Sequence, residues 1–156
     1  MADERRRFDV SLVTPDGPAY EGAVEMLIVP GAAGEIGVLA RHAPLVATLK
    51  AGSTRVHVSR DEVLEFATGP GFFKVELDRA IALVDDAVSA HDIDADRAEA
   101  QLEQARAELA RIEAGESEAD RWQVEQRIRH AENQLAVAGT PGESIRPRLS
   151  AGRERA

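Results

Sequence analysis

The sequence has no cysteine, few aromatic residues and no excess of positive charge. Without cysteine, the 156-residue chain cannot form a disulfide framework or a thiolate metal site. Aromatic residues make up only 4% of the chain, which predicts an aliphatic core without stacking platforms for single-stranded nucleic acid. The formal net charge of −9 disfavours phosphate binding, which needs concentrated Lys and Arg. We therefore expect no nucleic-acid partner.

Long apolar runs are also missing. No segment approaches the roughly eighteen apolar residues of a membrane span, and the N-terminal Met-Ala-Asp-Glu-Arg-Arg-Arg lacks the apolar centre of a signal peptide. We expect a cytosolic chain that does not insert directly into a membrane. Its 44% of hydrophobic residues suffice for one domain, or for a small domain with an appendage.

The first half of the chain consists of short apolar segments separated by turn residues. Residues 8–14 alternate apolar and polar and then meet Pro-Asp-Gly-Pro, which predicts a strand and a turn. Similar segments follow, and no helical periodicity interrupts them. Residues 1–86 are therefore expected to form an all-β sandwich of about nine to ten strands, with further strands at 19–24, 26–29, 45–49, 54–58, 63–67, 72–77 and 80–84.

The second half has helical periodicity. After a linker at 87–93, Asp94 is the expected N-cap of a helix that ends at Gly115, and Ser117 is the expected N-cap of a second helix that ends at Gly139. Because the connection is short, residues 94–139 should form an antiparallel two-helix hairpin. Its coiled-coil seam is expected at Ala98, Leu102, Ala105, Leu109, Ile112, Val124, Ile128, Ala131, Leu135 and Ala138.

The expected seam is narrow because four of its ten positions are Ala. Such a hairpin buries too little apolar surface to be strongly held, and it should lean on the β domain, on a partner, or on each in turn. We expect the single Trp, Trp122, to pack against the first helix. The tail at 140–156 has no periodicity and is predicted to be disordered.

A glycine-rich stretch at 30–45 is the most distinctive part of the sequence. Gly31, Gly34 and Gly37 predict a tight turn, and neither a P-loop ending nor a following helix is present. The whole pattern, Pro-Gly-x-x-Gly-Glu-Ile-Gly-Val-Leu-x-x-His-Ala-Pro-Leu followed by Leu-Lys-Ala-Gly, resembles the epsilon subunit of bacterial F-type ATP synthases. That family has an N-terminal β-sandwich and a C-terminal helical hairpin, in the order expected here.

The resemblance implies a non-catalytic subunit of a proton-translocating complex. Such a subunit couples gamma to the rotor c-ring, lies at the cytoplasmic face of the bacterial inner membrane, and inhibits ATP hydrolysis through its hairpin. It implies contacts of Glu35 and His42 with gamma and the c-ring. It also implies that Arg121, Arg127 and Arg129 meet acidic residues of the beta subunit within the alpha and beta assembly.

A second motif, Ile93-Asp94-Ala95-Asp96-Arg97-Ala98, resembles the ATP-binding signature of some bacterial epsilon subunits. The implied ligand residues are Ile93, Asp94, Arg97 and Ala98, and the implied ligand is a weakly bound regulatory ATP, with no cofactor required. A helix N-terminus favours anions, and Arg97 could reach a phosphate. The alternative interpretation is a capped helix. Basic positions that ATP-binding relatives use later in the hairpin are Gln104, His130 and Gln134 here, and Arg127 and Arg129 are possible substitutes.

No catalytic or metal constellation is visible in the sequence. The four histidines are scattered without helical pairing, and no serine lies in a nucleophile elbow. We expect a protein that is not an enzyme and has no metal site. The alternative function is a free-standing coiled-coil adaptor that inserts its acidic tip, Glu116, Glu118 and Asp120, into another enzyme.

Overall fold

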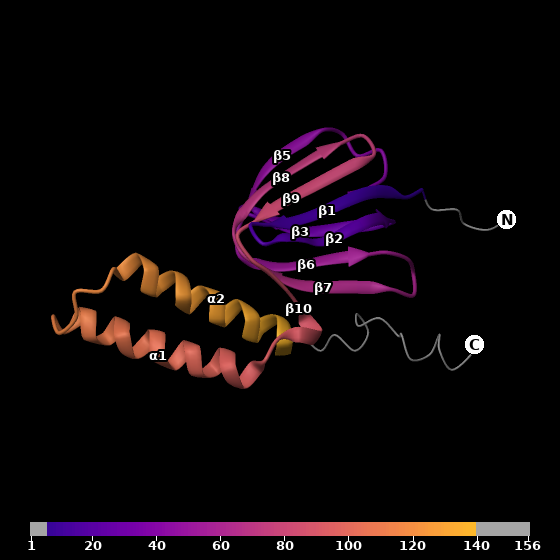
Figure 1. Ribbon diagram of the computed structural model, residues 1–156. Helices are drawn as coiled ribbons and strands as arrows, with labels where there is room; N and C mark the ends of the chain where they lie inside the picture. The colour runs from indigo at the N-terminus through magenta and orange to yellow at the C-terminus, as the bar shows by residue number, and fades with distance from the viewer. Residues whose placement is uncertain (1–5, 140–156) are drawn as a thin grey trace, which may run out of the picture.

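A computed structural model describes residues 6–139, which form a β domain followed by a helical hairpin (Figure 1). This arrangement confirms the predicted fold class. The ten strands are β1 (Phe8–Thr14), β2 (Gly17–Val24), β3 (Met26–Gly31), β4 (Gly34–Leu39), β5 (Leu45–Leu49), β6 (Gly52–His57), β7 (Val63–Thr68), β8 (Gly71–Glu76), β9 (Arg79–Val84) and β10 (Ala87–Ser89).

The strands form two five-stranded layers of one continuous sheet. One layer has the order β10-β7-β6-β3-β4, and the other has the order β5-β8-β9-β1-β2. The layers join where β3 meets β5 through the single pair Gly31 and Leu49. Strands β1 and β9 run parallel, whereas the other neighbours are antiparallel. The sheet therefore folds over on itself as a sandwich.

The core of the sandwich is mostly aliphatic, and Phe8, Phe66 and Phe73 are its aromatic members. Alternate residues of each strand point inward because successive side chains of a strand lie on opposite faces. In β8, for example, Phe73 and Val75 are buried, whereas Phe72 and Lys74 are exposed. The other fully enclosed side chains include Val10, Leu12, Val24, Leu27, Val29, Val38 and Val56.

The glycine-rich stretch is a β-hairpin rather than one loop. Gly34 has a φ of +144°, and a Cβ on Gly31 would lie 2.6 Å from the Gly34 carbonyl oxygen, so the turn joins β3 to β4 at these two positions. Gly37 lies inside β4, and the prediction that it belongs to the turn was wrong. Consequently Glu35 is the second residue of β4, and His42 follows the end of that strand.

The segment expected to be a linker at 87–93 is structured. Ala87–Ser89 form β10, which pairs antiparallel with β7, and a 3-10 helix, η1 (Ala90–Asp92), follows. The sequence gives no clue to this pairing because β10 has three residues and its partner lies about twenty positions earlier in the chain. The β domain thus continues to Ser89.

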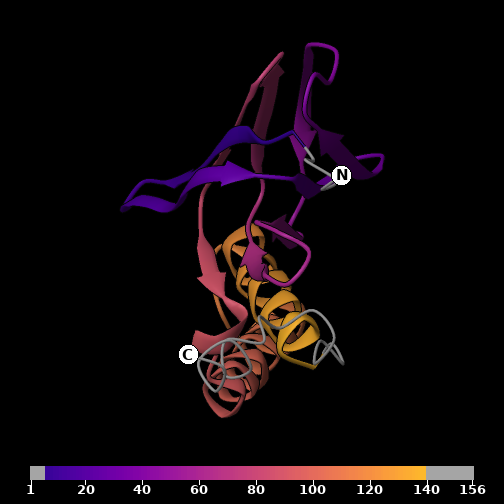
Figure 2. The ribbon, with the colours of Figure 1, turned by 90° about the vertical axis from the view of Figure 1, so that its right-hand side faces the viewer.

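The hairpin consists of α1 (Ala95–Glu113) and α2 (Arg121–Gly139), which pack side by side (Figures 1 and 2). Asp94 caps α1 as predicted, since its Oδ1 accepts from the Arg97 backbone amide at 3.1 Å. At α2 the predicted cap was wrong. Asp120, not Ser117, accepts from the Trp122 amide at 2.9 Å, while the Ser117 hydroxyl bonds Glu108.

The seam follows the predicted spacing only in part. Its most buried residues are Ala98, Leu102, Ala105, Val124, Ala131 and Val137. Val137 is buried where Ala138 was expected, and Trp122 is 65% exposed, so its predicted packing against α1 was wrong. Residues two apart point to different sides of a helix, which turns Trp122 away from the seam position Val124. The predicted disordered tail at 140–156 lies outside the described residues.

Candidate functional site

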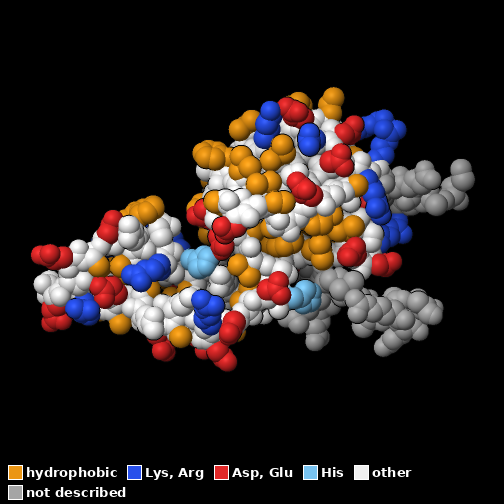
Figure 3. Space-filling model, in the orientation of Figure 1, with side chains coloured by type: hydrophobic (Ala, Val, Ile, Leu, Met, Phe, Trp, Pro, Cys, Tyr) orange, Lys and Arg blue, Asp and Glu red, His pale blue; other side chains and the backbone are white. Residues whose placement is uncertain are grey.

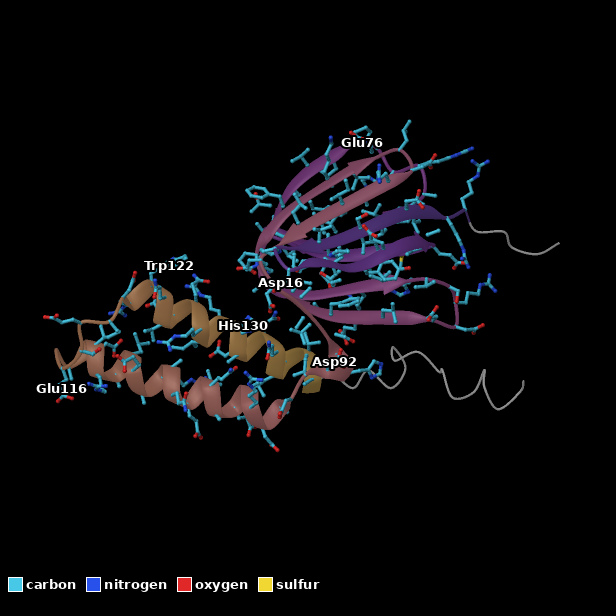
Figure 4. All side chains as sticks on the ribbon, in the orientation of Figure 1. Asp16, Glu76, Asp92, Glu116, Trp122 and His130 are labelled. Atoms are coloured by element: carbon cyan, nitrogen blue, oxygen red, sulfur yellow. The ribbon has the colours of Figure 1, made fainter. Side chains whose placement is uncertain are left out.

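The candidate site is the cleft where the hairpin meets the β domain. Its floor is formed by the turns between β5 and β6, between β7 and β8, and after β9, and its wall is formed by the helices. Figure 4 shows His130 on the side of α2 that faces the β domain, whereas Glu116 lies at the free end of the hairpin. The main cavity in this cleft has a volume of about 460 Å³, within the range of small-molecule sites. It is lined by Gly69, Pro70, Asp85, Gln101, Gln104, Gln126, Arg127, Arg129, His130 and Asn133, among others.

A second, smaller cavity holds the N-terminus of α1. Ile93, Asp94 and Arg97 line it together with Gln101, His130 and Gln134. The fold therefore gathers three residues of the predicted nucleotide motif with two of the positions that basic residues occupy in ATP-binding relatives. Ala98 does not line it, because its side chain is 1% exposed and belongs to the helix seam. Gln101 and His130 line both cavities.

His130 links the two cavities to the β domain. Its Nδ1 lies 3.4 Å from Asp86 Oδ2, and its Nε2 lies 2.9 Å from the amide nitrogen of Gln134. Since that amide nitrogen can only donate, the neutral ring accepts at Nε2, and Nδ1 is the ring nitrogen that lies near Asp86. One imidazole therefore lies between the turn after β9 and Gln134 on the side of α2 that lines the cleft.

The floor of the cleft carries an excess of negative charge. Burial raises the pKa of Asp85, and the neighbouring Asp86 raises it further, whereas His130 acts in the opposite direction. The Asp85 carboxylate packs over Gly69, where an added Cβ would overlap it. A cationic group in this part of the cleft is electrostatically favoured.

Asn133 makes the most specific contact between the hairpin and the β domain. Its Nδ2 donates to the Thr68 carbonyl at 3.1 Å and to the Gly52 carbonyl at 3.3 Å. Gly52 and Thr68 face each other at the ends of β6 and β7. Sequence analysis missed Asn133 and Asp86, since their partners lie far away in the chain and no local pattern marks them.

The structure distributes the predicted partner-contact residues over four places. Glu35 pairs with Arg55 at 2.7 Å on the β domain, and His42, whose ring lies 2.7 Å from the Ala43 carbonyl, stands beyond the other end of β4. Arg121 contacts both Glu125 and Glu113 at the hairpin turn. Arg127 and Arg129 line the cleft. These five residues therefore do not form one surface.

An exposed apolar face covers the outside of β5, β8 and β9. Phe72 and Leu83 are cross-strand neighbours with exposed fractions of 63% and 51%, and Val46 on β5 is exposed by 73%. Figure 3 shows hydrophobic side chains gathered over this part of the β domain. We call Val46, Phe72 and Leu83 the outer apolar face. Exposed apolar groups of this kind mark interaction surfaces.

The described residues contain no group of three His, Asp or Glu that could hold a metal ion. Within the same residues, neither helix has the length and apolar character needed to cross a membrane.

Comparison with known proteins shows the protein family to which the β domain is similar. Residues 7–90 match the family described as ATP synthase, Delta/Epsilon chain, beta-sandwich domain. The ATP synthase epsilon chain of Rubrobacter xylanophilus is 35% identical over 141 residues, covering 88% of this chain and 96% of the relative. The epsilon chain of Halalkalibacterium halodurans is 40% identical over 130 residues, covering 83% and 96%. The chain belongs to the ATP synthase epsilon chain family.

Solved structures agree with this assignment. A chain of the Euglena gracilis mitochondrial ATP synthase, solved as OSCP/F1/c-ring, superposes with a TM-score of 0.70 at 25% identity, covering 83% of this chain and 80% of that one. A chain of the Tetrahymena thermophila mitochondrial ATP synthase central stalk and c-ring has a TM-score of 0.58 at 12% identity, covering 86% and 98%. The second likeness concerns the fold alone.

Proposed function

We propose that this epsilon chain is a non-catalytic central-stalk subunit that joins gamma to the rotor c-ring of a bacterial ATP synthase. The complex would lie at the cytoplasmic face of the inner membrane. The observation that carries the proposal is the outer apolar face. Its side chains are exposed to solvent, although the sandwich encloses a core of its own. A partner that covers it removes Phe72 and Leu83 from water, and full burial of such a side chain contributes about 1.5–3 kcal/mol.

The test is co-purification of the full chain with gamma. Phe72→Ser combined with Leu83→Ser should weaken gamma binding about tenfold or more, since both side chains lose their apolar contacts. Trp122→Ser is the matched control, because it removes an equally exposed apolar side chain from the hairpin. Equal binding by the double variant and the unmodified chain would contradict the proposal.

Glu35 and His42 are proposed as separate contacts with the c-ring and gamma. Leu39 ends β4, and at the usual rise per residue roughly 13 Å of strand separates it from Glu35. His42 lies beyond Leu39, so single substitutions of Glu35 and His42 test the two contacts separately. Glu35→Ala and His42→Ala should each weaken assembly while leaving the unfolding transition of the free chain in place. Undiminished assembly in both variants would argue for a different contact surface.

We propose that the hairpin restrains ATP hydrolysis when it leaves the β domain. In the docked arrangement Arg127 and Arg129 line the cleft, so undocking would free them for acidic residues of the beta subunit. Removal of the chain after residue 91, which spares β10, should raise ATP hydrolysis by the reconstituted complex. Replacement of Arg121, Arg127 and Arg129 by Ala should do the same. If neither change accelerates hydrolysis, the hairpin serves assembly only.

Weak regulatory binding of ATP in the second, smaller cavity, at the N-terminus of α1, is also proposed. The support is geometric, since Asp94, Arg97 and His130 share one cavity. Arg97→Ala should abolish the heat of ATP binding measured by calorimetry on the full chain, because the phosphates lose the cation of the motif. Arg106→Ala is the control, since Arg106 pairs with Glu132 outside the cleft lining. Absence of binding by the unmodified chain at millimolar ATP would reduce the motif to a helix cap.

A further inference from the structure

Strand β4 leaves one edge of the sandwich open, and this edge is complementary to a second copy of itself. Strand β4 pairs with β3 along one side, and no other strand of residues 6–139 pairs with its opposite side. We propose that two copies of this chain associate through their β4 strands, antiparallel and about a two-fold axis. The inference concerns the chain before assembly and does not depend on the partners proposed above.

The other three edge strands of the described sheet are protected in ways that natural sheets commonly use. Strand β10 has only three residues, and β2 carries Pro18 beside an irregularity in its pairing with β1 at Leu12 and Val13. Strand β5 is partly covered, because the Thr48 carbonyl accepts from the Ala32 amide at 2.9 Å. Strand β4 has no proline, no lysine and a regular register along its six residues. It is therefore the edge to which a further strand can add.

The main-chain groups of β4 point away from the sandwich at every second residue. The Pro30 carbonyl accepts from the Lys50 amide at 3.0 Å, so the even-numbered residues of β3 face β5 and β6, and its odd-numbered residues face β4. The β4 partners of these odd-numbered residues are even-numbered and point back toward β3. The amide and carbonyl groups of Glu35, Gly37 and Leu39 consequently point outward, where a further strand would lie.

This row of groups matches the same row of a second copy. In an antiparallel arrangement centred on Gly37, Gly37 lies opposite Gly37 and Glu35 lies opposite Leu39 of the second copy, so every outward group meets a partner. The Leu39 carbonyl, which accepts from the His42 amide at 3.2 Å, keeps a second lone pair for this bond. The charges also agree, because Glu35 lies near one end of β4 and Arg41 follows the other end. Opposite charges therefore approach each other at both ends of the paired strands.

The paired surface is small, so the association should be weak. Six residues from each copy bury less than the roughly 800 Å² per partner of a standard interface. We expect a dissociation constant of about 0.1–1 mM. Pairing covers Glu35 and the open edge, which would keep unassembled chains from adding to other sheets.

Sedimentation equilibrium of the full chain at about 10 μM to 2 mM tests the proposal, in about 0.2 M salt to screen the net charge of −9. The average mass should rise with concentration from 16.8 kDa toward twice that value. Gly37→Lys and Gly37→Glu should each weaken association about fivefold, because like charges then lie opposite each other across the axis. Both variants should fold, since a Cβ at Gly37 has no neighbour within 4 Å. An equimolar mixture of the two should associate again, because Lys then lies opposite Glu.

A second pair of variants tests the register at Leu39, whose side chain is 58% exposed, so its replacement leaves the core unchanged. Leu39→Glu should weaken association because it faces Glu35 of the second copy, whereas Leu39→Lys should not. Equal effects of these two substitutions would overturn the antiparallel arrangement centred on Gly37.

Ala19→Lys is the matched control, because Ala19 is an exposed residue of another edge strand, β2, and it should leave association unchanged. Phe72→Ser combined with Leu83→Ser should also leave it unchanged, which separates the β4 edge from the outer apolar face. A mass that stays at the single-chain value at every concentration overturns the proposal. Loss of association in the double serine variant, or a mixture of the Gly37 variants that associates no better than either one, also overturns it.

Discussion

Replacement of Asn133 by Ala should loosen the hairpin from the β domain without unfolding either part. The change removes two hydrogen bonds, of 3.1 and 3.3 Å, to the carbonyls of Thr68 and Gly52. Each such bond contributes about 0.5–1.5 kcal/mol net. Because these bonds are long and the freed carbonyls regain water in the open cleft, we expect a loss of about 1–2 kcal/mol. That loss corresponds to roughly a 5- to 30-fold fall in the docking constant.

Spin labels attached to Glu76→Cys on the β domain and to Glu116→Cys at the hairpin turn measure this fall, because undocking changes the distance between the two labels. The measurement is made at constant pH. Glu132→Ala is the matched control, since Glu132 is the neighbouring residue and its ion pair within residues 6–139 is with Arg106 across the hairpin, at 3.0 Å. It should leave the docking constant nearly unchanged. A change smaller than about twofold in Asn133→Ala, or an equal change in both variants, would refute the assignment of Asn133 as the docking contact.

Three further predictions concern the β domain. Gly71→Ala should lower the free energy of unfolding in urea by about 3 kcal/mol or more, because the new Cβ would lie 1.8 Å from the Leu83 carbonyl oxygen. Gly37→Ala is the control. It has open space around it and should change the free energy of unfolding by less than about 0.5 kcal/mol. Phe73→Ala should cost about 3–5 kcal/mol in the same assay, since its side chain is 1% exposed in the centre of the core. Burial, followed by the charge of Arg55, lowers the pKa of His57, so the unfolded chain binds this proton more readily than the folded one. Stability should therefore fall as the pH drops below about 6.5, and His57→Gln should flatten that part of the pH profile; an unchanged profile would show that His57 does not cause it.

Local patterns account for most of the elements. The alternation in Phe8–Thr14 and the turn residues after it define a strand whatever lies beside it, because the period of two is a property of the extended backbone. The spacing of Ala98, Leu102 and Ala105 defines one face of a helix for the same kind of reason. Where a pattern is short, as in Ala87–Ser89, the partner strand decides the conformation, and the expectation of a linker did not anticipate it.

The sequence by itself determined a β domain followed by a helical hairpin, the cap at Asp94, and the resemblance carried by residues 30–45. Tertiary structure decided the parallel pairing of β1 with β9, the closure of the two layers at Gly31 and Leu49, and the site itself. Asn133 reaches partners 65 and 81 positions away, and His130 reaches Asp86 from another domain of the fold. Such contacts depend on how complete elements pack. Periodicity reports only which face of an element is apolar, and it does not report which distant group that face will meet.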